Sequence, residues 1–154
     1  MIKHPNDDKI IMLIIQNEIF AGGAAMDGKM LVELAKEARK KAYSPYSHYS
    51  VGAALLTKNG RVFTGCNIEN ATFSPTVCAE RTAFVKAISE GEREFEAIAI
   101  VGGAQDDRSV CYPCGVCRQF MSEFCSGDFR LFFADGDKTI EYSFDEIMPH
   151  RFHL

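Results

Sequence analysis

Two short stretches, VCAER at residues 77–81 and PCGVC at residues 113–117, bring together the residue types of a metal centre. They contain three thiols and, at Glu80, one carboxylate. Three protein ligands leave the fourth position of a tetrahedral zinc ion open, which is typical of a catalytic site rather than a structural one. A carboxylate beside such an ion can exchange protons with water that the ion acidifies. The stretches therefore predict a catalytic Zn²⁺ site with these ligands: Cys78, Cys114 and Cys117.

Each stretch is predicted to lie at the start of a helix. Cys78 begins the helix expected over residues 78–90, and Cys114 follows Pro113 at the start of the helix expected over residues 114–125. The positive end of a helix dipole lowers the pKa of a thiol and so favours metal binding. Three thiolates on one zinc ion leave a net negative charge that neighbouring cations can offset. The candidate cations, one from each stretch, are Arg81 and Arg118.

The second stretch leaves one alternative open, because Cys111, Cys114 and Cys117 form two overlapping C-x-x-C pairs. Cys114 and Cys117 are the preferred ligands, since Pro113 separates Cys111 from the helix. If Cys111 served as a fourth ligand, the site would be closed and could not be catalytic.

Length and composition describe one globular domain. The chain has 154 residues, 47% of them hydrophobic, and a formal net charge of -4 without a basic stripe. This balance argues against a nucleic-acid partner. The apolar run at residues 10–15 is too short to span a bilayer, and no signal peptide is visible, so no membrane partner and a cytoplasmic location are expected. In that compartment closely spaced cysteines favour metal binding over disulfides.

The order of the predicted elements indicates an α/β fold. Asn59-Gly60 between two strand-like runs is a strong hairpin signal, and the apolar run at 97–101 is typical of a buried central strand. We expect a three-layer α/β/α sandwich with a five-stranded mixed sheet over residues 29–154, preceded by an N-terminal extension at 1–28. Helices are predicted at 28–42, 78–90, 114–125 and 143–147, and strands at 51–57, 61–67, 96–101, 130–134 and 139–142.

Several further motifs occur in a fixed order along the chain. They are AYSPYSHYSVGAALL at 42–56, GCNIENA at 65–71, CAERTA at 78–83, SEG at 89–91, AIAIV at 97–101 and PCGVCRQ at 113–119. With these motifs, residues 31–152 resemble the small homotetrameric cytidine deaminases.

The resemblance implies a zinc-dependent hydrolase of pyrimidine salvage that converts cytidine and 2'-deoxycytidine to uridine and 2'-deoxyuridine with release of ammonia. Glu80 would be the proton shuttle. Because the carboxylate of Glu69 would repel a 3'-phosphate, a free nucleoside suits the site better than a polymer. The resemblance also implies these substrate contacts: Asn67 and Glu69 to the ribose 3'-hydroxyl, the backbone of Ala79 to the base edge, Tyr49 stacking near the pyrimidine, and Phe152 closing the site of a neighbouring subunit.

The chain departs from the family pattern near the expected pocket. Tyr49 stands where phenylalanine is usual and Phe73 where tyrosine is frequent, while Cys111 and Tyr112 replace smaller residues. Three rival functions remain: a deaminase of an aminoglycosyl-cytosine antibiotic such as blasticidin S, a nucleic-acid deaminase, and a noncatalytic zinc-binding module. The Asn-Ile-Glu motif at 67–69 weighs against the first of these, and the acidic balance against the second.

Overall fold

The computed structural model describes residues 26–104 and 109–152. Residues 1–25 of the expected N-terminal extension lie outside this part, so the boundary between residues 28 and 29 stays a prediction. At the start of the described chain, Asp27 caps helix α2 by accepting a hydrogen bond from the Met30 backbone N–H at 2.8 Å.

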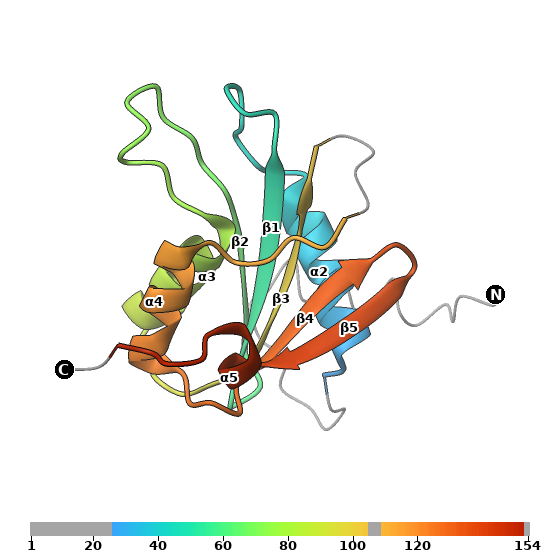
Figure 1. The fold of residues 1–154 in the computed structure, drawn as a ribbon, viewed down its shortest axis with the longest axis vertical. Coiled ribbons are helices and arrows are strands. Elements are labelled where there is room, and N and C mark those ends of the chain that lie inside the picture. Colours follow the sequence, from blue (N-terminus) through green and yellow to red (C-terminus); the bar gives the residue numbers. More distant parts are fainter. Residues whose placement is uncertain (1–25, 105–108, 153–154) are drawn as a thin grey trace.

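A five-stranded sheet forms the centre of the molecule (Figure 1). The strand order is β2-β1-β3-β4-β5, in which β3 and β4 are parallel and every other neighbouring pair is antiparallel. The mixed five-stranded sheet expected from the sequence is therefore confirmed. The strands are β1 (Ser50–Thr57), β2 (Val62–Cys66), β3 (Phe95–Gly103), β4 (Arg130–Asp135) and β5 (Lys138–Ser143).

Helices cover both faces of this sheet. Figure 1 shows α3 and α4 together on one side and α2 on the other. Successive residues of a strand point to opposite faces, and in β1 both faces are buried: Leu55 packs in the core beneath α3 and α4, whereas Leu56 packs in the core beneath α2. This is the predicted three-layer sandwich. The helices are α2 (Gly28–Arg39), α3 (Ala79–Ser89), α4 (Gly115–Phe124) and α5 (Phe144–Ile147).

Two strand glycines let the helices approach the sheet closely. A Cβ on Gly52 would lie 2.1 Å from the Ala35 carbonyl oxygen of α2. A Cβ on Gly65 would lie 2.4 Å from the Ala79 carbonyl oxygen of α3. Because Ala79 lies between Cys78 and Glu80, the contact at Gly65 fixes the height of the candidate site above the sheet.

Within residues 26–104 and 109–152, none of the helices combines the length and the apolar character that crossing a membrane requires.

Candidate active site

The three predicted thiols lie together at the starts of α3 and α4. Cys78 is the N-cap residue of α3, Cys114 is the N-cap residue of α4, and Cys117 lies in the first turn of α4. The three sulfurs lie within 4.8 Å of one another, and the Cys78 and Cys114 sulfurs are 3.8 Å apart. Tetrahedral zinc–thiolate bonds of about 2.3 Å separate the sulfurs by roughly 3.8 Å. The donor set and its spacing therefore fit a zinc ion.

The pKa values of Cys78 and Cys117 are shifted in opposite directions. A hydrogen bond from Cys117, helped by others from Arg81 and Cys114, lowers the pKa of Cys78 to about 5 although burial opposes the shift. The same bond, together with burial, raises the pKa of Cys117. Arg81 lies against the cluster, with Nη2 3.8 Å from the Cys78 sulfur and 3.1 Å from the Thr76 carbonyl oxygen. A cation thus borders the thiol cluster.

Glu80 is a buried carboxyl group beside these thiols. It lies in the first turn of α3 and is only 4% exposed. Burial raises the pKa of Glu80 to about 7, and the neighbouring charge of Cys78 acts in the same direction. Its carboxyl group is also in hydrogen-bond contact with the Cys117 side chain. A group in this setting can gain and lose a proton near neutral pH.

Arg118 donates hydrogen bonds to backbone carbonyl oxygens at the start of α4 and at the end of α5. Its Nε donates to the Pro113 carbonyl oxygen at 2.8 Å, and Nη1 donates to the Ile147 carbonyl oxygen at 2.6 Å. These bonds join the segment before Cys114 to the end of α5. The expected charge-balancing role of Arg118 stays a prediction, whereas this anchoring role was not visible in the sequence.

Cys111 lies outside the thiol cluster found among the described residues. It is buried, and its sulfur is 2.6 Å from the position that a Cβ on Gly102 would occupy. Burial raises the pKa of the Cys111 thiol, and its side chain hydrogen-bonds with that of Tyr49. β3 continues to Gly103, beyond its predicted end, by pairing with β1, and the missing Cβ at Gly102 leaves room for this sulfur. Among the described residues, Cys78, Cys114 and Cys117 would hold the ion without Cys111 as a fourth ligand.

Two loops project from the same end of the sheet next to this cluster, one before β1 and one after β2 (Figure 1). Ile68 joins them, because it pairs with Tyr43 on one side and Val77 on the other. This pairing brings Glu69 close to the loop before β1. Its Oε2 accepts the backbone N–H groups of Tyr46 at 2.9 Å and Ser47 at 3.3 Å, and its Oε1 accepts the Ser47 hydroxyl.

Asn67 holds the next part of the same loop. Its Oδ1 accepts the Val51 backbone N–H at 2.8 Å, and its Nδ2 donates to the Tyr49 carbonyl oxygen at 2.8 Å. Asn67 is buried, whereas the Tyr49 side chain is 37% exposed. The structure thus brings Asn67, Glu69 and Tyr49 together around one loop, and the two polar residues also serve as its anchors.

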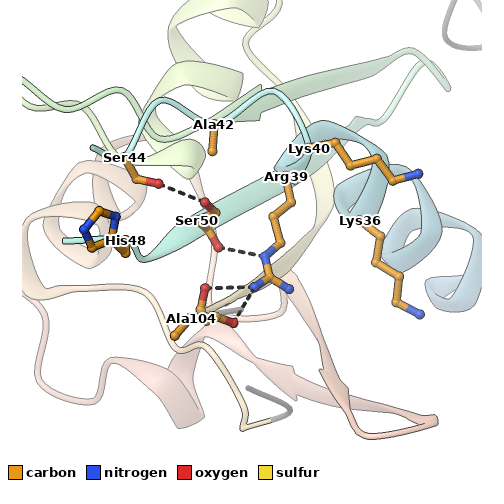
Figure 2. Close-up of a pocket in the computed structure, with 9 residues that line it drawn as sticks. Lys36, Arg39, Lys40, Ala42, Ser44, His48, Ser50 and Ala104 are labelled. Atoms are coloured by element: carbon orange, nitrogen blue, oxygen red, sulfur yellow. Dashed lines mark hydrogen bonds between the residues drawn. The ribbon is translucent and has the colours of Figure 1, made fainter. Parts of the chain in front are cut away.

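The other side of the loop faces a hollow of about 1040 Å³ lined by α2 and the ends of β1 and β3. Figure 2 shows Arg39 in this hollow donating to the carbonyl oxygens of Ser50 (2.9 Å), Gly103 (2.8 Å) and Ala104 (3.0 Å). Ser44 and Ser50 share a further hydrogen bond of 2.8 Å. Arg39 and this serine pair therefore fix the ends of the loop that carries Tyr49.

The remaining predicted residues lie at different depths. Ala79 is fully buried at the start of α3. Phe152 is 63% exposed, and its carbonyl oxygen accepts a hydrogen bond from the Gln119 side chain at 3.4 Å. Phe73 is 70% exposed in the loop after β2, where its ring meets the edge of Tyr46.

The structure is thus a mixed α/β sandwich with three thiols at two helix N-termini and a buried carboxyl group beside them. This combination is typical of zinc hydrolases in which a side-chain carboxyl group transfers protons. The comparisons with known proteins specify the class further. The model of the family described as the cytidine and deoxycytidylate deaminase zinc-binding region matches residues 26–132. The chain belongs to this family.

Relatives with known names agree with this assignment. The cytidine deaminase of Halalkalibacterium halodurans is 47% identical over 128 residues, which is 82% of this chain and 95% of that protein. The crystal structure of the cytidine deaminase from Burkholderia pseudomallei superposes with a TM-score of 0.76 at 42% identity, covering 82% of this chain and all of that one. The blasticidin-S deaminase of Bacillus cereus is 35% identical over 127 residues, covering 79% of this chain and 89% of that protein.

Proposed function

We propose that this chain is a cytidine deaminase, which hydrolyses cytidine and 2'-deoxycytidine to uridine and 2'-deoxyuridine and releases ammonia. The observation that carries the proposal is the buried carboxyl group of Glu80 beside three thiols with zinc-ligand spacing. The relatives named above, 42–47% identical and called cytidine deaminases, support the choice of substrate.

The residues present fit a zinc ion held by Cys78, Cys114 and Cys117. When bound, the ion supplies Lewis acidity that makes water a nucleophile near neutral pH. The protein's own part is proton transfer. Glu80, buried beside the thiols, accepts a proton from the attacking water and delivers one to N3 of the base, while C4 is attacked. Glu80 then takes the proton of the hydroxyl formed at C4 and passes it to the amino group, which leaves as ammonia while the C4 carbonyl forms.

Replacement of Glu80 by glutamine tests this role. Glu80→Gln keeps the size of the side chain and removes its proton exchange, so we expect zinc content and melting temperature close to those of the wild type and a loss of turnover of about 10²–10⁴-fold. Turnover is followed by the loss of cytidine absorbance, with metal analysis of the same samples. Near-full activity in Glu80→Gln would refute the assignment, and equal loss of zinc would assign Glu80 to metal binding instead.

On the substrate side, we propose that Asn67 and Glu69 bind the sugar, that the backbone of Ala79 reads the base edge and that Tyr49 lines the base pocket. The acceptor oxygens of Glu69 suit a free hydroxyl and disfavour a phosphate, which supports a nucleoside over a nucleic acid. The 35% identity to a blasticidin-S deaminase makes that antibiotic the second candidate substrate. A panel of cytidine, 2'-deoxycytidine, blasticidin S and single-stranded oligonucleotides decides among them, and we expect turnover of the first two.

We also propose a homotetramer. An apolar hollow of about 630 Å³ lies beside the thiol cluster, lined by parts of α3 and α4. Val85 and Val116, which line it, are 53% and 61% exposed in the single chain. A second copy of the chain would cover these side chains and could bring its Phe152 to the site. Size-exclusion chromatography with light scattering should show a tetramer that Val85→Asp dissociates and that Glu33→Ala, an exposed change on α2 across the sheet from the hollow, leaves intact.

We also propose a role in pyrimidine salvage, since salvage enzymes recover free nucleosides, and a cytoplasmic location. The division into an extension at 1–28 and a catalytic domain at 29–154 is supported by the family match, which begins at residue 26. Activity of a chain that starts at residue 26 would test this division.

A further inference from the structure

Ser47 lies between the two halves of the proposed substrate site. Its hydroxyl donates a hydrogen bond to Oε1 of Glu69 and accepts one from the Tyr49 backbone N–H at 3.0 Å. In the proposed function Glu69 binds the sugar and Tyr49 lies against the base. One side chain therefore contacts both the carboxylate and the backbone that position a nucleoside.

The acceptor positions of Glu69 are almost filled by the loop. A carboxylate offers about four lone-pair positions, two on each oxygen. Oε2 accepts the backbone N–H groups of Tyr46 and Ser47, and Oε1 accepts the Ser47 hydroxyl. One position remains on Oε1 for a ligand. The Ser47 hydroxyl occupies the other position on that oxygen and so restricts the rotation of the carboxylate.

The loop around Ser47 is held firmly enough for this arrangement to be specific. The next residue, His48, has a φ of 56°, a conformation that non-glycine residues adopt rarely and only when surrounding contacts hold them. The His48 backbone N–H donates to the Ser44 carbonyl oxygen at 3.1 Å. Asn67 binds the backbone on the other side, at Tyr49 and Val51. Loss of the Ser47 hydroxyl would thus free the carboxylate of Glu69 while most loop contacts remain.

We propose that Ser47 is a positioning residue that holds Glu69 with a single acceptor position open for one sugar hydroxyl. The proposal rests on the proposed function and deepens it. It implies that a nucleoside lacking the hydroxyl that Glu69 binds gains from Ser47 only through the Tyr49 backbone contact. A nucleoside that carries this hydroxyl also binds to a carboxylate that is already oriented.

The test compares substrates with and without that hydroxyl in the full-length, zinc-loaded protein. We would measure kcat and KM for cytidine, and the inhibition constant of 2',3'-dideoxycytidine as a competitor, in the wild type, Ser47→Ala, Ser47→Thr and Ser44→Ala. Ser47→Thr keeps the hydroxyl. Ser44→Ala is the matched control, because it removes a loop hydrogen bond to Ser50 that does not involve Glu69.

We expect Ser47→Ala to raise KM for cytidine by about tenfold, the size of a hydrogen bond to a charged group, with kcat changed less. The inhibition constant of 2',3'-dideoxycytidine should rise by less than about threefold, because only the contact with the Tyr49 backbone is lost for it. Ser47→Thr should recover the wild-type ratio of the two constants, and Ser44→Ala should leave that ratio unchanged.

The proposal would be overturned if Ser47→Ala weakened the binding of both nucleosides equally, or of neither. It would also be overturned if Ser44→Ala changed the ratio of the two constants as much as Ser47→Ala does. If Ser47→Ala does not yield folded protein, Ser47→Cys, whose thiol is a weak donor, replaces it with the same criteria. The proposed function fails separately, through a zinc-loaded wild type that does not convert cytidine.

Discussion

Gly65→Ala should weaken zinc binding although residue 65 is not a ligand. A Cβ at this position would lie 2.4 Å from the Ala79 carbonyl oxygen and 2.6 Å from the Ala83 backbone nitrogen, where real Cβ contacts are not shorter than 3.0 Å. The start of α3 must therefore move away from β2 by at least 0.6 Å. Metal–ligand distances tolerate only about 0.2 Å, so the Cys78 sulfur would no longer match the two sulfurs of α4.

Two separate quantities should change. Overpacking of this kind costs about 1–3 kcal/mol of folding free energy, which lowers the melting temperature of the metal-free protein by about 2–4 °C per kcal/mol in a chain of this size. Displacement of Cys78 should in addition reduce zinc affinity by about tenfold, as changes just outside a ligand set commonly do. Competition with a chromogenic chelator measures the affinity, and thermal unfolding measures the stability.

Gly52→Ala provides the matched control on the opposite face of the sheet. Its Cβ would lie 2.1 Å from the Ala35 carbonyl oxygen, so it should destabilise the fold to a similar extent by displacing α2. Because α2 carries no zinc ligand, zinc affinity should stay within about threefold of the wild type. If both variants lose zinc affinity equally, or if neither does, the contact between β2 and α3 does not set the geometry of the thiols.

Three further outcomes are expected. Phe84→Ala should lower the free energy of unfolding in urea by about 3–5 kcal/mol, because Phe84 is fully buried and contacts four other phenylalanine rings; a loss below about 1 kcal/mol would contradict this. Hydrogen bonds from the Ser47 hydroxyl and the loop backbone hold the pKa of Glu69 below its ordinary 4.5, so their stabilisation is complete above pH 4.5 and is lost as the pH falls through the lower pKa of the folded protein. In metal-free protein the carboxyl resonance of Glu69 should titrate below 4.5, and Ser47→Ala should move its midpoint upward. Removal of zinc by a chelator should abolish turnover and lower the melting temperature, and Zn²⁺ but not Mg²⁺ should restore both, since thiolates prefer the softer ion.

Features that depend on short spacings could be predicted from the sequence. Asn59-Gly60 predicted the β1–β2 hairpin because that pair suits the backbone of a tight turn. Cys78 and the C-x-x-C pair at 114 and 117 predicted the thiol cluster, since helix N-termini bring such residues to one point. Whether Cys111 is a fourth ligand could not be decided from the sequence. Its sulfur packs against Gly102 of β3, in space that a Cβ at position 102 would fill, and this contact exists only in the folded chain.

Features that depend on contacts between distant segments could not be predicted in this way. The Asn-Ile-Glu motif suggested a sugar-binding pair, but Asn67 and Glu69 also hold the backbone of a loop about 20 residues earlier. Within this loop His48 has a φ of 56°. Arg118 stands beside the ligands in the sequence, and only the fold brings its guanidinium to the Pro113 and Ile147 carbonyl oxygens. Long flexible side chains find their partners only once the tertiary fold exists.

The position of the three sulfurs has a consequence for folding. Cys78 and Cys114 lie 36 residues apart, and the chain between them contains all of α3 and β3. A zinc ion held by both would be a cross-link that closes this loop. By the entropy estimate used for disulfides, a cross-link over a loop of that length stabilises the folded protein by about 4 kcal/mol, because it restricts the unfolded chain. In a reducing compartment a metal can provide such a constraint where a disulfide would not persist. The ion would then make the proposed enzyme harder to unfold as well as able to react.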